Sequence, residues 1–276
     1  MTSRAYAAVV IAALGVGTSS CGVSTQQEVE LGAQQSQQIN QQLPLVQDAQ
    51  ITQYVSQLGT QIARTTSRAD LPWQFYVVNS DVVNAFALPG GVVYVNRGVL
   101  ERADRMSELA SVLGHEIEHI VRRHAVKQME QMQGANVGVA LACTLTNICN
   151  NQAAAAAINV GGTAVFAKFS RDDERQADEG GFQNLVRAGI NPEGMLTFFQ
   201  KLLAEEQQSG SSSNVSAWFA DHPGTQDRIA DIQGLLSQLP ASQRQGLTSD
   251  TQQYQSVKRR VMSLPPAPRQ VASPGQ

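Results

Sequence analysis

The sequence predicts an α+β fold that is mainly helical, with a small β-sheet beside one long buried helix. Apolar residues recur at helical spacing through most of the chain, two short β-branched or aromatic segments follow Pro72, and the strands and helices do not alternate. The 276 residues are 42% hydrophobic and 16% charged, as in an ordinary globular protein. A formal net charge of −3 without a basic cluster argues against nucleic-acid binding.

The first 20 residues have the composition of a secretory signal peptide. A short basic start precedes the apolar stretch Ala5–Val16, which is short for a membrane span, and small residues then lead to Cys21. This cysteine resembles that of a bacterial lipobox, although Thr18 stands where such boxes carry Leu. We expect Cys21 to be lipidated and residues 21–25 to be a tether, with plain secretion as the alternative.

The other two cysteines, Cys143 and Cys149, suit an oxidising compartment and could bridge a short loop. The alternative is a pair of buried thiols. They lie in the apolar, Ala-rich stretch 135–169, which we predict to be a buried helical hairpin, with a membrane span as the alternative.

The first elements surround the small sheet. Residues 22–50 are rich in Gln and Ser and should join the anchor to the body, in part as helix. An amphipathic helix follows, with a buried stripe formed by Ile51, Tyr54, Val55, Leu58 and Ile62. Strands are predicted at Phe75–Val78 and Val92–Val95, with Gly90-Gly91 ahead of the second.

Helices dominate the rest of the chain. One is predicted from Ser107, as N-cap, to about Gly134, and its apolar residues surround it, which is typical of a helix buried in a domain. Further helices are predicted at 165–187, from Pro192 and from Pro223. Beyond Pro240 the chain is polar and Pro-rich. We expect the domain to span 26–239 and the tail, 240–276, to be disordered.

The long helix carries an HExxH motif from His115 to His119. Residues four apart lie one turn apart on a helix, so both imidazoles face the same way and can bind one zinc ion. Glu116 lies beside them, where it can take a proton from a zinc-bound water. The alternative is an ordinary helix with satisfied histidines, but burying these polar groups without partners would be costly.

A catalytic zinc needs a third protein ligand. His124 lies five residues past His119, or about 140° around the helix, and the metzincin spacing is absent, so we expect it to be structural or to support a ligand. Glu174 and Asp178 are one turn apart on a later helix. Glu174 could reach the metal while Asp178 orients a ligating histidine. The alternative is a solvated acidic face.

These motifs together resemble a known family. HExxH, then Ser170–Asp178 as S-R-x-x-E-x-x-A-D, then His222-Pro223 followed by Arg228, is similar to the HtpX and prenyl-protease type of gluzincin metallopeptidases. Asn84–Gly91 resembles the segment that this family carries ahead of its zinc helix. The resemblance covers about residues 26–239 and is strongest to soluble, periplasmic lipoprotein members.

The resemblance implies a zincin-type metalloprotease domain that binds one Zn²⁺. It implies His115, His119 and Glu174 as zinc ligands and Asp178 as the partner of a ligand. The family's His-Pro and Arg positions fall on His222 and Arg228. His222 could donate to the oxyanion, or occupy the open zinc position in a resting state, or simply begin a helix.

The segment before the zinc helix could bind substrate. Gly90 and Gly91 permit close backbone approach, and Val92–Asn96 could form an edge strand. We expect Gly90, Gly91, Val92 and Val93 to bind an extended chain by β-augmentation, which suits unfolded or misassembled proteins. The alternative is a hairpin with an ordinary glycine turn.

The predicted function is zinc-dependent endopeptidase of the bacterial cell envelope, at the periplasmic face of the outer membrane. Zinc would polarise the scissile carbonyl, Glu116 would move a proton from the attacking water to the leaving amine, and His222 or Arg228 would stabilise the oxyanion. One alternative is a periplasmic chaperone or assembly factor with a latent or structural zinc site. Another is a zinc hydrolase of small molecules, for which no motif beyond HExxH is present.

Overall fold

The computed structural model describes residues 22–132, 169–209 and 214–268. The signal peptide, Cys21, Cys143, Cys149 and nearly all of the predicted hairpin lie outside these residues. The strands are β1 (Gln74–Val78), β2 (Ala85–Leu88) and β3 (Val92–Asn96). The helices are α1 (Thr25–Gln42), α2 (Ala49–Ala63), α3 (Arg97–Arg102), α4 (Met106–Val121), α5 (His124–Met132), α8 (Arg171–Arg187), α9 (Glu193–Ser209), α10 (Ser216–Asp221), α11 (Thr225–Gln238), α12 (Ala241–Arg244) and α13 (Gln252–Met262). The prediction of a mainly helical α+β domain is confirmed.

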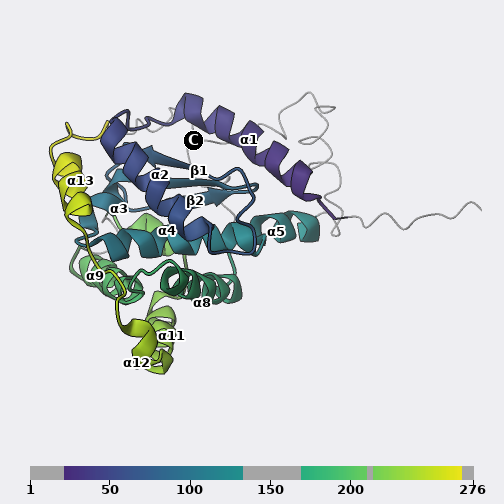
Figure 1. The fold of residues 1–276 in the computed structure, drawn as a ribbon. Helices are drawn as coiled ribbons and strands as arrows, with labels where there is room; N and C mark the ends of the chain where they lie inside the picture. Colours follow the sequence, from purple (N-terminus) through teal and green to yellow (C-terminus); the bar gives the residue numbers. More distant parts are fainter. Residues whose placement is uncertain (1–21, 133–168, 210–213, 269–276) are drawn as a thin grey trace, which may run out of the picture.

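The sheet has the order β1-β3-β2, with β1 parallel and β2 antiparallel to the central strand β3. Figure 1 shows α1 on one side of the sheet and α4 on the other. Successive residues of β3 face opposite sides, as strand geometry requires. Val92 and Tyr94 join a small core with Ile39 of α1, whereas Val93 and Val95 join the main core with α2 and α4. Each face of the sheet is therefore covered by helices.

The expectation that Val92–Asn96 forms an edge strand is wrong. Both sides of β3 are paired, since β1 and β2 flank it, and every residue of β3 is buried. The strands at the two edges are β1 and β2, and β2 packs against α4 and thus lies beside the HExxH helix. The sequence pattern did not identify β2 as a strand, because Ala85–Leu88 is short and follows directly on a turn.

Gly90 faces α1 instead of an open groove, and Gly91 faces Leu71 and Pro72. A Cβ on Gly90, whose φ is +79°, would lie 2.5 Å from Cα of Val29, and one on Gly32 would lie 1.9 Å from the carbonyl oxygen of Pro89. Gly91 has a φ of +108°, which also favours glycine. Gly90, Gly91, Val92 and Val93 are all buried. The close backbone approach predicted here is real for Gly90, but α1 makes it, and Val92 and Val93 belong to the central strand, so these four residues do not present the substrate edge that we expected.

The helix predicted from Ser107 to about Gly134 is two helices. It begins at Met106, with Ser107 already inside, and α4 ends at Val121. Arg123 then takes a φ of +60°, the only positive φ of a non-glycine residue in the described part of the chain, and α5 begins at His124. Neither Gly nor Pro marks this corner, so the helical pattern alone did not reveal it.

Helix α8 packs tightly along α4. A Cβ on Gly181 would lie 3.1 Å from the backbone carbon of Gly114, so the two helices approach almost backbone to backbone. Asn184 of α8 also donates from Nδ2 to Oε1 of buried Glu118 on α4, at 2.8 Å. The close crossing fixes the side chains of α8 against the HExxH motif.

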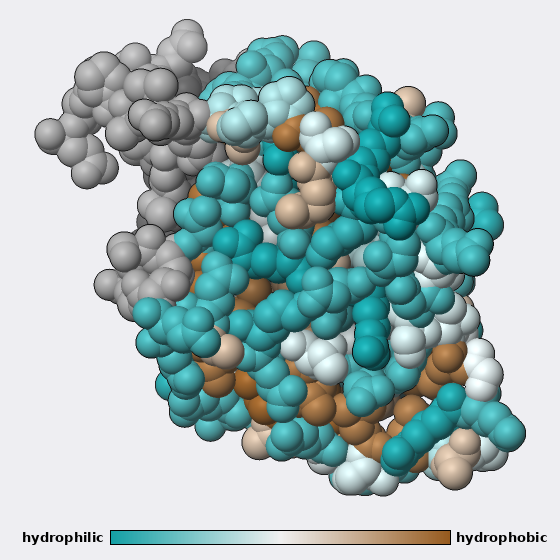
Figure 2. All heavy atoms as spheres, turned by 90° about the vertical axis from the view of Figure 1, so that its left-hand side faces the viewer, coloured by the Kyte–Doolittle hydropathy of each residue, from teal (hydrophilic) through white to brown (hydrophobic). Residues whose placement is uncertain are grey.

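The prediction of a disordered tail after Pro240 is wrong for the residues that the structure describes. The segment forms α12 and α13, and α13 packs on α2 and α3. Tyr254 donates from its hydroxyl to the carbonyl of Ala103 at 2.6 Å, and the Lys258 ammonium donates to the same oxygen at 2.7 Å. Figure 2, which views this side of the molecule, shows a mostly hydrophilic face with hydrophobic residues gathered at its lower end. Across the described ranges, no helix is both long and apolar enough to cross a membrane.

Candidate metal centre

The HExxH residues lie in the middle of the buried helix α4. The rings of His115 and His119 are 4.6 Å apart between centroids, and their Nε2 atoms are 3.0 Å apart. Both rings are at most 2% exposed. Two buried imidazole nitrogens this close require a shared proton or a bound cation between them.

Helix α8 brings a carboxylate to these nitrogens. Its start is fixed by a capping box in which Ser170 accepts from the backbone of Asp173 and Asp173 accepts from the backbone of Ser170. One turn into the helix, Glu174 lies with Oε2 3.4 Å from Nε2 of His115 and Oε1 3.4 Å from Nε2 of His119. The structure thus brings together the three predicted metal ligands.

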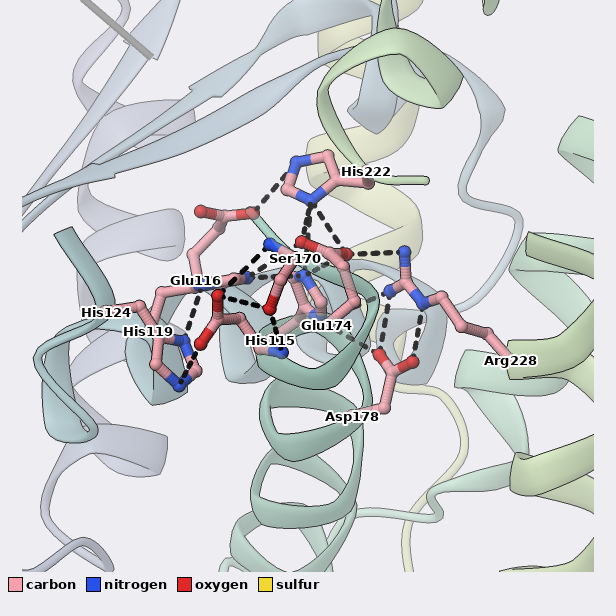
Figure 3. Close-up of polar contacts among 10 residues, drawn as sticks. His115, Glu116, His119, His124, Ser170, Glu174, Asp178, His222 and Arg228 are labelled. Carbon is pink, nitrogen blue, oxygen red and sulfur yellow. Dashed lines mark hydrogen bonds and ion pairs between the residues drawn. The ribbon is translucent and has the colours of Figure 1, made fainter. Parts of the chain in front are cut away.

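His222 completes the cluster from the end of α10. Its Nδ1 lies 3.2 Å from Oε2 of Glu174 and 3.3 Å from Nε2 of His115, while its Nε2 lies 3.6 Å from Oε1 of Glu116 (Figure 3). The side chain of Trp218, one helical turn earlier, packs against the ring of His222 at 4.4 Å between centroids. One donor atom from each of His115, His119, Glu174 and His222 lies within 4.8 Å of the other three.

This set of donors fits a zinc ion. Zinc accepts imidazole nitrogen and carboxylate oxygen in tetrahedral geometry, and all four residues are buried. Glu116 supplies an independent indication, because both of its carboxylate oxygens are buried without a hydrogen-bond partner among the described residues. A buried carboxylate is costly without a partner, and a bound metal with its water would supply one.

Each histidine of α4 is held from behind at its second ring nitrogen. Nδ1 of His115 lies 2.8 Å from Oδ1 of Asp178, as the sequence predicted. Nδ1 of His119 lies 3.0 Å from Nδ1 of His124. His124 therefore supports a ligand, one of the two roles expected for it. Such partners fix the ring orientation and the tautomer of a ligating histidine.

Arg228 lies behind the ligands. Its Nε and Nη2 donate to the two oxygens of Asp178 at 2.6 and 2.8 Å, and Nη1 lies 2.7 Å from Oε2 of Glu174. The guanidinium also sits 4.5 Å from the ring centroid of Phe199. The side chain is 3% exposed. This geometry directs the guanidinium at the carboxylates, so the oxyanion contact considered for Arg228 is not what the structure favours.

The charges of the site shift its pKa values in the metal-free protein. Burial and Arg228 lower the pKa of His115, but Glu174 and Asp178 outweigh them and raise it to about 9. Burial lowers the pKa of His119 to about 3. Burial also raises the pKa of Glu116, as a general base requires. Burial opposes ionisation of Glu174, yet His222 and Arg228 hold its pKa well below the usual range.

Sequence reasoning missed two aromatic residues of the site. Trp218 packs on His222, and Phe169 stacks on His119 with centroids 4.0 Å apart and an interplanar angle of 25°. Trp218 stands four residues before His222, a helical spacing that could have revealed the pair. Phe169 has no such signal, because its contact depends on how α8 crosses α4.

Comparisons with known proteins agree with this site. A model of peptidase family M48 matches residues 49–236. The chain is 32% identical over 257 residues to the beta-barrel assembly-enhancing protease of Yersinia pestis, covering 90% of this chain and 51% of that protein. It is 30% identical over 166 residues to metalloprotease LoiP of Escherichia coli, covering 60% of this chain and 64% of that protein.

A mitochondrial relative is also similar. The chain is 31% identical over 199 residues to metalloendopeptidase OMA1 of Schizosaccharomyces pombe, covering 72% of this chain and 56% of that protein. The chain spans about half the length of the beta-barrel assembly-enhancing proteases that it matches. The family match includes all of the metal cluster, from His115 to His222. The chain belongs to peptidase family M48.

Proposed function

We propose that this protein is a zinc-dependent endopeptidase. The observation that carries the proposal is the cluster of His115, His119 and Glu174 around one point, beside the carboxylate of Glu116, which has no hydrogen-bond partner among the described residues. A purely structural metal site needs no general base, whereas peptide hydrolysis does. Membership of a peptidase family supports the same reaction.

Bound by these residues, a zinc ion would act as a Lewis acid that polarises the scissile carbonyl and acidifies a water. Glu116 takes the proton of the attacking water. It then passes this proton to the leaving amine, since its raised pKa suits both steps. Asp178 and Arg228 hold His115 and Glu174 in place behind the metal.

His222 has a double role in this proposal. Its Nδ1 lies within the donor set, so the site offers four protein donors. A catalytic zinc keeps one position open for water or substrate. We therefore assign the arrangement to a resting state, in which His222 would help to hold the zinc and would give up this position to substrate. The displaced imidazole is then free to donate a hydrogen bond to the oxyanion.

The substrates that we propose are unfolded or misassembled polypeptides. Strand β2 lies at one edge of the β1-β3-β2 sheet and packs against α4, beside the catalytic motif. An extended chain could add to this edge by β-augmentation, which uses main-chain contacts more than side chains. We therefore assign to Ala85–Leu88 the substrate-binding role that was predicted for Gly90–Val93.

The proposed location is the bacterial cell envelope. Two relatives are named as a beta-barrel assembly-enhancing protease and as metalloprotease LoiP, and the first name points to envelope proteins as clients. The signal-peptide composition and the lipobox-like Cys21 support a lipid anchor at the periplasmic face of the outer membrane. Quality control of misassembled envelope proteins is the role that fits this placement.

One observation favours a second candidate. A site with four protein donors is also what a latent or structural zinc site presents, which would suit a chaperone or assembly factor. Casein zymography separates the two. We expect the purified protein to cleave casein, to stop when a chelator removes zinc, and to resume when zinc is restored. A protein that holds zinc and protects unfolded clients but never cleaves casein would instead be the chaperone.

A further inference from the structure

The corner between α4 and α5 places His124 where an unbroken helix could not. Continued past Val121, α4 would carry His124 about 140° away from His119. Instead Arg123 takes a left-handed conformation, with a φ of +60°, and the chain turns. His124 then faces back toward the zinc ligand one turn below, with Nδ1 3.0 Å from Nδ1 of His119 (Figure 3).

A buried carboxylate on α1 holds this corner. Glu28 is fully buried, and its Oε2 accepts from Nε of Arg123 at 3.1 Å. Both Glu28 oxygens also accept from Arg68, at 2.9 and 3.0 Å, while Nη1 of Arg68 donates to the carbonyl of Ile120 at 2.9 Å. The guanidinium of Arg123 additionally donates to the carbonyl of Val23. Glu28 thus forms ion pairs with both Arg68 and Arg123, which contact the end of α4.

The hydrogen bonds beyond the corner fix the tautomer of His119. His119 presents Nε2 to the other donors of the cluster, at 3.0 Å from His115 and 3.4 Å from Glu174. Ligation through Nε2 places the ring proton of His119 on Nδ1, from which it donates to Nδ1 of His124. Nε2 of His124 then carries a proton and lies 3.5 Å from Oδ1 of Asp173. His124 is 2% exposed, so bulk water does not compete for its contact with His119.

We propose that His124 is a positioning residue for the zinc ligand His119, and that Glu28 sets its position through the left-handed corner at Arg123. Helix α1 begins ahead of the segment that the family model matches, yet it acts on the metal centre through this path. The inference rests on the proposed function, because it requires that His119 bind zinc.

Zinc affinity, measured by competition with a chromophoric chelator, tests the first link. His124→Leu removes the acceptor, and we expect zinc binding to weaken about 10- to 100-fold. His124→Asn keeps an acceptor near the position of Nδ1 and should recover most of that loss. The absorption spectrum of the cobalt-substituted protein should shift in His124→Leu and return toward the wild-type spectrum in His124→Asn.

Two substitutions at one residue test the second link. Glycine adopts a positive φ freely and a β-branched residue does not. Arg123→Gly should therefore weaken zinc binding less than Arg123→Val does. Glu28→Gln should also weaken zinc binding, and combining it with His124→Leu should add little, because both act on the same ring.

Glu101→Gln is the matched control, since it removes a partly buried carboxylate from its 2.6 Å ion pair with Arg97, away from the metal centre. It should leave zinc affinity unchanged, and thermal unfolding of each metal-free variant checks its fold. If the wild type binds zinc and Glu174→Ala abolishes binding, but folded His124→Leu binds as tightly as the wild type, the inference is overturned and the proposed function stands. A wild type that binds no zinc overturns both.

Discussion

The two histidines of α4 lie one turn apart and present Nε2 to the same point, yet they meet opposite surroundings. A carboxylate lies behind His115, with Nδ1 2.8 Å from Asp178, and Arg228 in turn neutralises that carboxylate. A neutral imidazole and a phenyl ring flank His119. The pKa is raised to about 9 for His115 and lowered to about 3 for His119. The same motif therefore contains one histidine held by a charged partner and one held by a neutral hydrogen-bond partner and a stacked ring.

The two histidines differ because different helices pack against the two ends of the motif. Helix α8 crosses α4 at the level of His115 and delivers Asp178, while α11 delivers Arg228. His119 lies nearer the end of α4, where the corner and the start of α8 enclose it. We expect substitutions on the His115 side to act through charge and those on the His119 side to act through geometry.

Asp178→Asn should have the largest effect. It removes the charge behind His115 and leaves the buried guanidinium of Arg228 with a single carboxylate, so zinc affinity should fall about 10- to 100-fold and the free energy of unfolding by about 3 kcal/mol. Chelator competition and urea denaturation measure these changes. Asp172→Asn, an exposed acid of the same helix, should change neither. Equal effects of the two substitutions would show that the charge of Asp178 does not act on His115.

Zinc binding should release a proton from His115 and none from His119. The folded-state pKa of His115 is raised to about 9, so this group stabilises the metal-free fold fully below its unfolded pKa and loses that contribution as pH rises through 9. Zinc requires the neutral ring, so affinity should rise by up to about tenfold per pH unit between pH 7 and 9. Titration calorimetry at pH 7.5 in buffers of different ionisation enthalpy should detect the proton. Affinity that is flat over this range would contradict the assignment.

Gly181→Ala should loosen the helix pair on the His115 side. Its Cβ would lie 3.1 Å from the backbone of Gly114, so α8 must shift, at a cost of about 1–3 kcal/mol of unfolding free energy. Zinc affinity should also fall, because Glu174 and Asp178 belong to α8 and would move with it. In Gly234→Ala the new methyl meets nothing within 4 Å, so helix propensity should stabilise α11 by up to about 1 kcal/mol. Loss of stability in both variants would show that the tight crossing is not the cause.

Phe169→Leu should have the smallest effect of these substitutions and tests how far ring stacking holds His119. It removes the ring stacked on His119 but keeps apolar volume, so we expect a loss of about 0.5–1.5 kcal/mol in unfolding free energy. The pH dependence of zinc binding should stay as in the wild type, because no charge changes. A shifted pH profile in this variant would show that Phe169 acts on the charge balance instead.

The candidate metal ligands could be predicted from the sequence, His115 and His119 because their spacing is a local signal, and Glu174 because the family resemblance selected it from an acidic helix. The spacing of His115 and His119, and of Glu174 and Asp178, follows the helical repeat. The strand order could not be predicted, since pairing β3 between β1 and β2 depends on contacts remote in sequence. The corner at Arg123 contains no Gly or Pro that would predict it. The ion pairs with Glu28 of α1, which is remote in sequence, support the corner instead. Helix α13 could have been found, since Tyr254, Val257 and Val261 form a buried stripe that the polar composition masked.

Glu116 is proposed to be the general base for a water that is activated by a metal held by His115, His119 and Glu174. This role is tested by measuring zinc content and the rate of casein cleavage together in the wild type, Glu116→Gln and Glu174→Ala. We predict that Glu116→Gln keeps its zinc while cleavage falls about 100- to 10,000-fold, and that Glu174→Ala loses both zinc and cleavage. Zinc-loaded Glu116→Gln that cleaves at the wild-type rate, or Glu174→Ala that keeps wild-type zinc affinity, would contradict it.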